Sequence, residues 1–148
     1  MPSACFVDTN VLLYTKDPTA PKQRARAVGW LAELARRKAA VISPQVMNEF
    51  AHNILRKFPQ VSVPELVENL EALRPLCIAG MDDSTALAAL AIHRRYRFSF
   101  YDSSLVATAL AYGCDLFLSE DFSHNQRIGD MRIVNPFKDE PIAVLDQL

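Results

Sequence analysis

The chain has 148 residues, with 16 Lys and Arg against 17 Asp and Glu, so its formal net charge of −1 at pH 7 excludes the overall basic character of many nucleic-acid-binding proteins. Half of the residues are hydrophobic, which excludes a disordered chain and predicts one compact domain over residues 1–148. No apolar run approaches the roughly twenty residues that span a bilayer, and no signal-peptide pattern opens the sequence, so we expect a cytoplasmic protein without a membrane partner.

Strand and helix patterns alternate in the first part of the chain. An apolar run over residues 4–7 predicts a strand, and residues 21–35 carry apolar side chains at helical spacing. Residues 40–42 predict a second strand. A serine–proline pair then supplies an N-cap and a first helical residue for a helix over 43–58, which Pro59 ends.

The middle of the chain continues this alternation. Pro64 is expected to open a helix that runs to residue 73, and the apolar residues 76–78 are a third strand candidate. Gly80 marks a turn before an alanine-rich helix over residues 84–95.

The last third repeats the pattern. Asp102 is expected to cap a helix that ends at Gly113, and strands are expected over residues 114–118 and 131–134. A final apolar patch covers residues 142–145. Regular alternation of strand and helix predicts an α/β fold, a doubly wound sandwich with a mostly parallel sheet.

Four acidic residues lie near the ends of predicted strands or on a helix that follows one. They are Asp8, Glu49, Asp102 and Asp121. The carboxyl ends of parallel strands meet along one edge of a sheet, so these side chains can converge on one cleft. Clustered carboxylates repel one another unless a divalent cation neutralises them. A ligand set made only of oxygen suits Mg²⁺ or Mn²⁺ better than zinc.

Each acidic residue also has an ordinary structural explanation. Asp8 and Asp102 are both suited to capping the N-terminus of a helix, and Asp121 is a normal loop residue after a strand. Glu49 lies at the margin of an apolar helix stripe, where most glutamates are simply solvated. Glu120 is a further alternative, because it can replace or supplement Asp121. The functional explanation gains its weight from the four residues together.

The acidic residues stand within short segments whose order and spacing are more specific than any one segment. These segments are Val7-Asp8-Thr9-Asn10-Val11-Leu12, Glu49, Tyr101-Asp102 with Val106-Ala107-Thr108-Ala109, and Leu118-Ser119-Glu120-Asp121-Phe122. In this order they resemble the PIN-domain ribonucleases, and most closely the VapC-type toxins of VapBC toxin–antitoxin systems. The resemblance covers nearly the whole chain.

This resemblance implies a PIN-like three-layer α/β/α sandwich with a mostly parallel central sheet. It implies a metal-dependent endoribonuclease whose catalytic residues hold Mg²⁺ or Mn²⁺, as one ion or two. The implied metal ligands are Asp8, Glu49, Asp102 and Asp121. The residues implied to position those ligands are Thr9, Asn10 and Ser119.

The resemblance also implies partners: an RNA substrate, a small VapB-like antitoxin that blocks the cleft, and a second copy of the chain in a homodimer. Arg94, Arg95, Tyr96 and Arg97 are candidates for contacts with the RNA backbone, although the same residues fit a dimer surface somewhat better. A non-catalytic PIN-like module that binds RNA or protein is the alternative function. Such a module is expected to lack carboxylates, and here none of the four is missing.

Two other enzyme classes also place an aspartate after a first strand. A haloacid-dehalogenase-type phosphatase usually has a second aspartate two residues later, where this chain has Asn10. A response-regulator receiver needs an early acidic pair and a late lysine, and no lysine lies between Asp121 and Lys138. Both classes are therefore disfavoured.

Overall fold

The computed structural model describes residues 3–148 and contains a sheet with the strand order β2-β1-β3-β5-β4. The strands are β1 (Cys5–Val7), β2 (Ala40–Val41), β3 (Leu116–Leu118), β4 (Arg127–Ile128) and β5 (Met131–Val134). The helices are α1 (Thr9–Tyr14), α2 (Pro21–Arg36), α3 (Pro44–Lys57), α4 (Val63–Leu73), the 3₁₀ helix η1 (Arg74–Leu76), α5 (Asp83–Tyr96), α6 (Phe100–Tyr112) and α7 (Pro141–Leu145).

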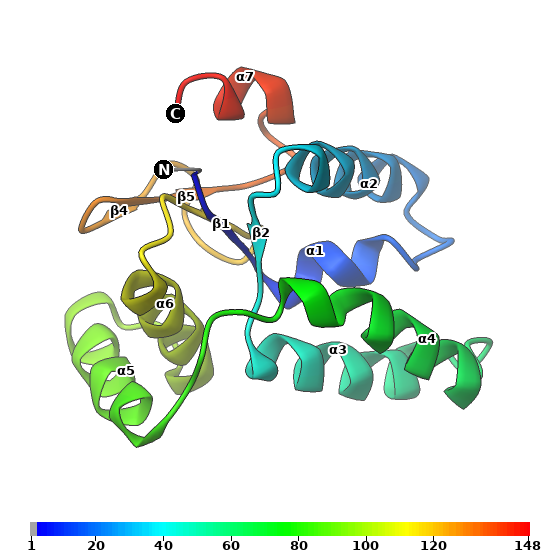
Figure 1. Cartoon of the computed structure of the whole chain (residues 1–148), viewed down its shortest axis with the longest axis horizontal. Helices are drawn as coiled ribbons and strands as arrows, with labels where there is room; N and C mark the ends of the chain where they lie inside the picture. Colours follow the sequence, from blue (N-terminus) through cyan, green and yellow to red (C-terminus); the bar gives the residue numbers. More distant parts are fainter. Residues whose placement is uncertain (1–2) are drawn as a thin grey trace.

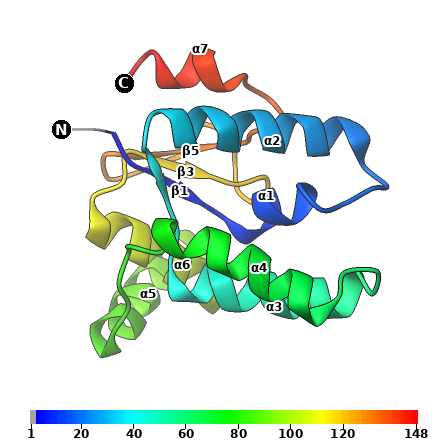
Figure 2. The same cartoon turned by 45° about the vertical axis from the view of Figure 1, so that its right-hand side comes forward.

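The sheet is parallel except for β4, which pairs antiparallel with β5. Helices α2 and α7 lie on one side of the sheet, and α3 to α6 lie on the other (Figures 1 and 2). The predicted three-layer α/β sandwich with a mostly parallel sheet is therefore confirmed. Within residues 3–148, no helix combines the length and the apolar character that crossing a membrane requires.

The core is centred on β1 and β3, which lie side by side in the middle of the sheet. Every residue of both strands is buried, as expected where helices cover both faces of a parallel sheet. Phe6 and Phe117 stack with their ring centroids 5.3 Å apart. In the register between the two strands, Val7 pairs with Leu118, so the residues that follow each strand emerge at the same edge.

Most helix starts follow from local sequence. Ser43 caps α3 and Ser62 caps α4, each through its hydroxyl oxygen, and each helix has a proline in its first turn. Asp82 and Thr85 form a reciprocal capping box at the start of α5. Helices α2 to α5 thus begin within one residue of their expected starts, whereas α6 begins three residues earlier than expected.

Three segments differ from the expectations. Residues 76–78 are not a strand: η1 extends to Leu76, and only an isolated parallel bridge joins Cys77 to Ile42. Pro75 lies inside η1, and because proline has no backbone N–H it cannot take part fully in a strand ladder. The other two differences are β4, too short to show a periodicity, and the five-residue helix α7, which forms where the sequence shows only an apolar patch.

Trp30 joins α2 to the segment that follows β5. Its side chain is fully buried, and its indole N–H lies 3.0 Å from the carbonyl oxygen of Pro136 and 3.1 Å from that of Asp139. Arg26 donates to the same two carbonyl oxygens. Trp30 and Arg26 therefore both hold the segment that follows β5 against α2.

We expect Trp30→Phe to lower the free energy of unfolding by about 2 kcal/mol, because it removes the indole hydrogen bond and leaves a smaller ring in the core. Arg26 still satisfies the two carbonyl oxygens, so the loss stays moderate. Chemical denaturation measures it, with Tyr112→Phe at an exposed position as the control. Equal stability of the Trp30→Phe protein and the wild type would contradict this role.

Candidate active site

All four predicted acidic residues lie at the carboxyl edge of the sheet. Asp8 follows β1, Asp121 lies in the loop after β3, and the other two are on α3 and α6. We call Asp8, Glu49, Asp102 and Asp121 the acidic cluster. Their charges act on one another: Asp102 and Glu49 help to raise the pKa of Asp8, and Asp121 and Glu49 help to raise that of Asp102.

Asp8 is held from three directions. Its Oδ1 accepts a hydrogen bond of 2.7 Å from the backbone N–H of Thr9, so it is also the N-cap of α1. Its Oδ2 accepts bonds from the Ser119 hydroxyl at 2.7 Å and from the Asn10 amide at 3.1 Å. The capping role and the cluster role are therefore compatible, because one carboxylate fulfils both.

Burial raises the pKa of Asp8 to about 7. The hydrogen bonds from Ser119 and Thr9 oppose this shift, and the neighbouring carboxylates add to it. Within residues 3–148, no Lys, Arg or His forms an ion pair with any member of the acidic cluster. A buried carboxylate among other carboxylates is thus left without a cationic partner from the protein.

Ser119 and Asn10 connect Asp8 to Asp121. The fully buried Ser119 hydroxyl donates to Asp8 and accepts from the backbone N–H of Asp121 at 3.1 Å. The Asn10 amide nitrogen lies 3.0 Å from the Ser119 hydroxyl oxygen, 3.0 Å from Oδ2 of Asp121 and 3.1 Å from Oδ2 of Asp8. The two amide hydrogens of Asn10 are therefore shared among three acceptor oxygens, one each from Asp8, Ser119 and Asp121.

Glu49 is oriented by two side chains. The Thr9 hydroxyl donates to its Oε1 at 2.8 Å, and Gln45 donates to its Oε2 at 3.2 Å. Gln45 also donates to the carbonyl oxygen of Tyr101 at 3.0 Å, which ties α3 to the start of α6. The sequence analysis missed Gln45, although its position four residues before Glu49 on one helix is a usable signal.

Asp102 does not cap its helix, and this prediction is wrong. Ser99 is the N-cap of α6, since its hydroxyl oxygen accepts from the backbone N–H of Asp102 at 3.1 Å. Asp102 lies in the first helical turn and is half-buried, so burial raises its pKa, a hydrogen bond with Ser99 opposes the rise, and Asp121 and Glu49 add to it. A carboxylate in the first turn is also favoured by the helix dipole.

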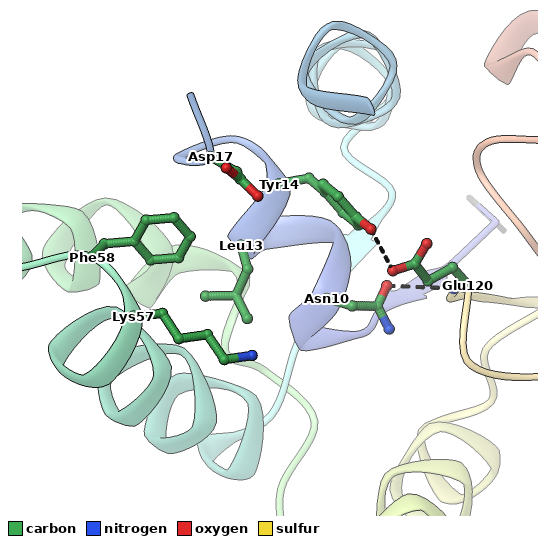
Figure 3. A pocket seen from close by; sticks show the side chains of 7 residues that line it. All are labelled: Asn10, Leu13, Tyr14, Asp17, Lys57, Phe58 and Glu120. Carbon is green, nitrogen blue, oxygen red and sulfur yellow. Dashed lines mark hydrogen bonds between the residues drawn. The ribbon is translucent and has the colours of Figure 1, made fainter. Parts of the chain in front are cut away.

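Asp121 and Glu120 have different partners. Asp121 shares the Asn10 amide with Asp8. The Glu120 carboxylate instead accepts a hydrogen bond of 2.8 Å from the Tyr14 hydroxyl (Figure 3). Of the two neighbouring acidic residues, Asp121 is therefore the one that joins the acidic cluster.

The basic candidates lie at the C-terminal end of α5. The guanidinium of Arg95 is 5.3 Å from the centroid of the Tyr96 ring, and Arg97 ends the helix in the left-handed conformation with φ of 66°. Arg94, Arg95 and Arg97 are exposed. Their contact with RNA stays a prediction.

The chemistry of the acidic cluster fits a hard divalent cation. Its donors are all carboxylate oxygens, and no cation of the described chain neutralises them. As the side chains stand within residues 3–148, no three of His, Cys, Asp or Glu are arranged to hold a metal ion together. The Asn10 amide donates to oxygens of Asp8 and Asp121, so a cation that binds these two oxygens would replace the amide as their partner.

Comparison with solved structures shows the same fold in toxin–antitoxin proteins. A toxin–antitoxin complex from Klebsiella pneumoniae has a chain with 19% identity and a TM-score of 0.64, matched over 90% of this chain and 98% of that one. VapC20 of Mycobacterium tuberculosis, a toxin that cleaves the sarcin–ricin loop, has 18% identity and a TM-score of 0.62, matched over 87% of this chain and 99% of that one. VapBC2 of Rickettsia felis, bound to a DNA fragment from their promoter, has 13% identity and a TM-score of 0.62, matched over 88% of this chain and 96% of that one.

A search of curated proteins finds no match. The family model of the PIN domain matches residues 5–127, a span that begins with β1, contains all four members of the acidic cluster and reaches β4. The chain therefore belongs to the PIN-domain family.

Proposed function

We propose that this protein is a metal-dependent endoribonuclease that hydrolyses RNA phosphodiester bonds, and that it is the VapC-like toxin of a type II toxin–antitoxin pair in the cytoplasm. The observation that carries the proposal is the acidic cluster, in which four carboxylates converge without a basic partner in the described chain. Membership of the PIN-domain family supports it, as does the likeness in fold to toxins such as VapC20.

The acidic cluster would hold Mg²⁺ or Mn²⁺, with Asp8 and Asp102 as the central ligands and Glu49 and Asp121 beside them. When bound, such a cation neutralises charge on the scissile phosphate and lowers the pKa of a water that attacks it. The protein's contribution is orientation. Asp8 follows a central strand and is fixed by Ser119 and the backbone of Thr9, so its position changes little when a substrate arrives.

The second carboxylate pair is oriented through other elements. Thr9 and Gln45 hold Glu49 from two sides, and Asn10 holds Asp121. These three polar side chains fix the carboxylates before RNA binds, so little ordering is needed in the transition state.

The proposal includes three partners. RNA is the substrate, and a VapB-like antitoxin covers the acidic cluster to suppress cleavage. The K. pneumoniae and R. felis relatives, described as a toxin–antitoxin complex and as VapBC2, support this partner. A homodimer is the expected assembly. The exposed arginines at the end of α5 serve either the RNA backbone or the dimer surface.

Cleavage of a mixed pool of small RNAs tests the function directly. The purified protein is incubated with Mg²⁺, with Mn²⁺ or with EDTA, and metal binding is measured separately by calorimetry. We expect discrete cuts that need the metal. Absence of both cleavage and metal binding would refute the enzyme and favour the non-catalytic scaffold.

Ser119→Ala is expected to reduce cleavage by about 10- to 100-fold, because Asp8 loses a donor and the backbone N–H of Asp121 loses an acceptor. Ser103→Ala is the matched control, since Ser103 is equally buried but its hydroxyl donates to the carbonyl oxygen of Phe98. Initial cleavage rates and circular dichroism are compared for both proteins. Equal loss in both would assign the effect to packing.

A further inference from the structure

A cavity of about 190 Å³ adjoins the acidic cluster, between α1 and the C-terminal end of α3 (Figure 3). Its lining includes Asn10, Leu13, Tyr14, Lys57, Phe58 and Glu120. The cavity combines apolar side chains with two carboxylates, those of Asp17 and Glu120, and with the ammonium group of Lys57. No step of the cleavage chemistry proposed above uses these three charged groups.

The carboxylate of Glu120 is fixed in this cavity but only partly used. Its Oε1 accepts the hydrogen bond from Tyr14, and its backbone N–H lies 3.4 Å from the Asn10 side-chain oxygen. Within the described residues 3–148, its Oε2 accepts no hydrogen bond and its carboxylate forms no ion pair. A carboxylate oxygen held in place without a donor is suited to receive one from a ligand.

Lys57 supplies the opposite charge. Its side chain extends from the last turn of α3 toward Asn10 (Figure 3), and it forms no ion pair within the part of the chain that the structure describes. Leu13 and Phe58 line the same cavity and give it apolar surface on the side of Lys57 (Figure 3). A ligand with a flat apolar face, a hydrogen-bond donor edge and an anionic group matches this arrangement, and a nucleotide has all three.

We propose that this cavity binds the guanine base of the nucleotide that flanks the scissile phosphate, and that Glu120 thereby selects the cleavage site. Guanine presents two adjacent N–H donors, N1–H and the N2 amino group, which match the two oxygens of a carboxylate. Adenine and cytosine place an acceptor beside their amino group, and uracil places carbonyl oxygens on both sides of N3–H. Those acceptors are repelled by Glu120.

Asn10 gives the cavity its connection to the chemistry. Its amide nitrogen bonds Asp8 and Asp121, and the same side chain lines the cavity. A base in the cavity would therefore be separated from the acidic cluster only by the Asn10 side chain. This position suits the nucleotide next to the phosphate that is cleaved. The selection of a cleavage site by Glu120 rests on the proposed RNA cleavage, but binding of the base can be measured whether or not the protein cuts RNA.

The test is an NMR titration of the full chain with GMP, AMP, CMP and UMP in EDTA, following the backbone amides of Leu13, Tyr14, Phe58 and Glu120. We expect GMP to bind about tenfold more tightly than the other three nucleotides. Glu120→Gln is expected to remove this preference, because an amide group then faces the guanine donors. Lys57→Met is expected to weaken all four nucleotides alike, since a phosphate contact carries no base information.

Asp17→Asn is the matched control. Asp17 lines the same cavity, and the hydroxyl and backbone N–H of Thr19 both donate to its Oδ1. If Glu120 alone selects the base, the Asp17→Asn variant keeps the GMP preference. Equal binding of all four nucleotides, or shifts confined to other residues, overturns the proposal even if the protein cuts RNA. If the wild type prefers GMP and the Glu120→Gln variant does not, the base site is supported, even if the protein cuts no RNA. Absence of RNA cleavage would then count against the proposed nuclease function and not against the base site.

Discussion

Replacing Asp8 with asparagine is expected to lower the rate of RNA cleavage by about a thousandfold or more while the fold stays intact. Asp8 is the one buried member of the acidic cluster, since Glu49 and Asp102 are half-buried and Asp121 is exposed. Asparagine keeps the volume and can still accept from the Thr9 backbone, but it carries no negative charge for a cation. Single-turnover cleavage at saturating Mn²⁺ measures the loss.

The control for this experiment is Asp130→Asn. Asp130 is an exposed aspartate in the turn between β4 and β5. It should cut at the wild-type rate. Wild-type cleavage by the Asp8→Asn protein would refute the assignment of Asp8, whereas an unfolded variant would be recognised by its circular dichroism spectrum.

Metal binding is expected to raise the thermal midpoint of the protein strongly at pH 8 and weakly at pH 5.5. A cation present at about a hundred times its dissociation constant adds about 2.7 kcal/mol, which corresponds to about 5–10 °C for a chain of this size. Asp8 must be ionised to bind the cation, and with a pKa of about 7 it is mostly protonated at pH 5.5. Scanning fluorimetry with Mn²⁺ and with EDTA measures both midpoints.

The metal-free protein should show the opposite trend with pH. The folded-state pKa of Asp8, about 7, lies above its ordinary value of 3.8, so the stability that its protonated form contributes is complete below about pH 4 and is lost as the pH rises through 7. Asp8→Asn removes this contribution to the pH dependence, and it also removes most of the stabilisation by Mn²⁺. Equal metal-induced shifts at pH 5.5 and pH 8 would exclude Asp8 as a ligand.

The fold was largely predictable because its signals are local. Serine and proline mark the starts of α3 and α4, and alternating apolar segments indicate a parallel sheet with helices on both sides. Residues 76–78 were wrongly predicted to form a strand, because a short apolar run has no periodicity that separates a strand from other structure. Pro75 and the packing around it decide the conformation of this segment. The two-residue strand β4 pairs with β5 across a turn in which Gly129 has a positive φ of 59°, and a strand this short leaves no periodicity in the sequence.

The acidic cluster was predictable in membership but not in detail. Parallel strands bring Asp8 and Asp121 to one edge whatever their distance in sequence, and helices that start there contribute the other two carboxylates. The choice between Asp121 and Glu120 depends on side-chain directions, which only the folded chain provides. Asp102 was predicted to cap α6, but Ser99, three residues earlier, caps it. Serine and aspartate are about equally good N-caps, so the residue type at one position does not decide where the helix begins.

The pairing of β1 with β3 has a consequence for the integrity of the protein. Val7 pairs with Leu118, so Asp8 and Ser119 leave the two strands at the same level. If the strands slipped by one residue, side chains would exchange faces, and Leu118 or Glu120 would take the place of the serine beside Asp8. Activity would therefore be lost before the chain visibly unfolds, and cleavage would report on the correct register of the two central strands. The proposed cleavage activity would thus be absent from copies in which these two strands pair out of register.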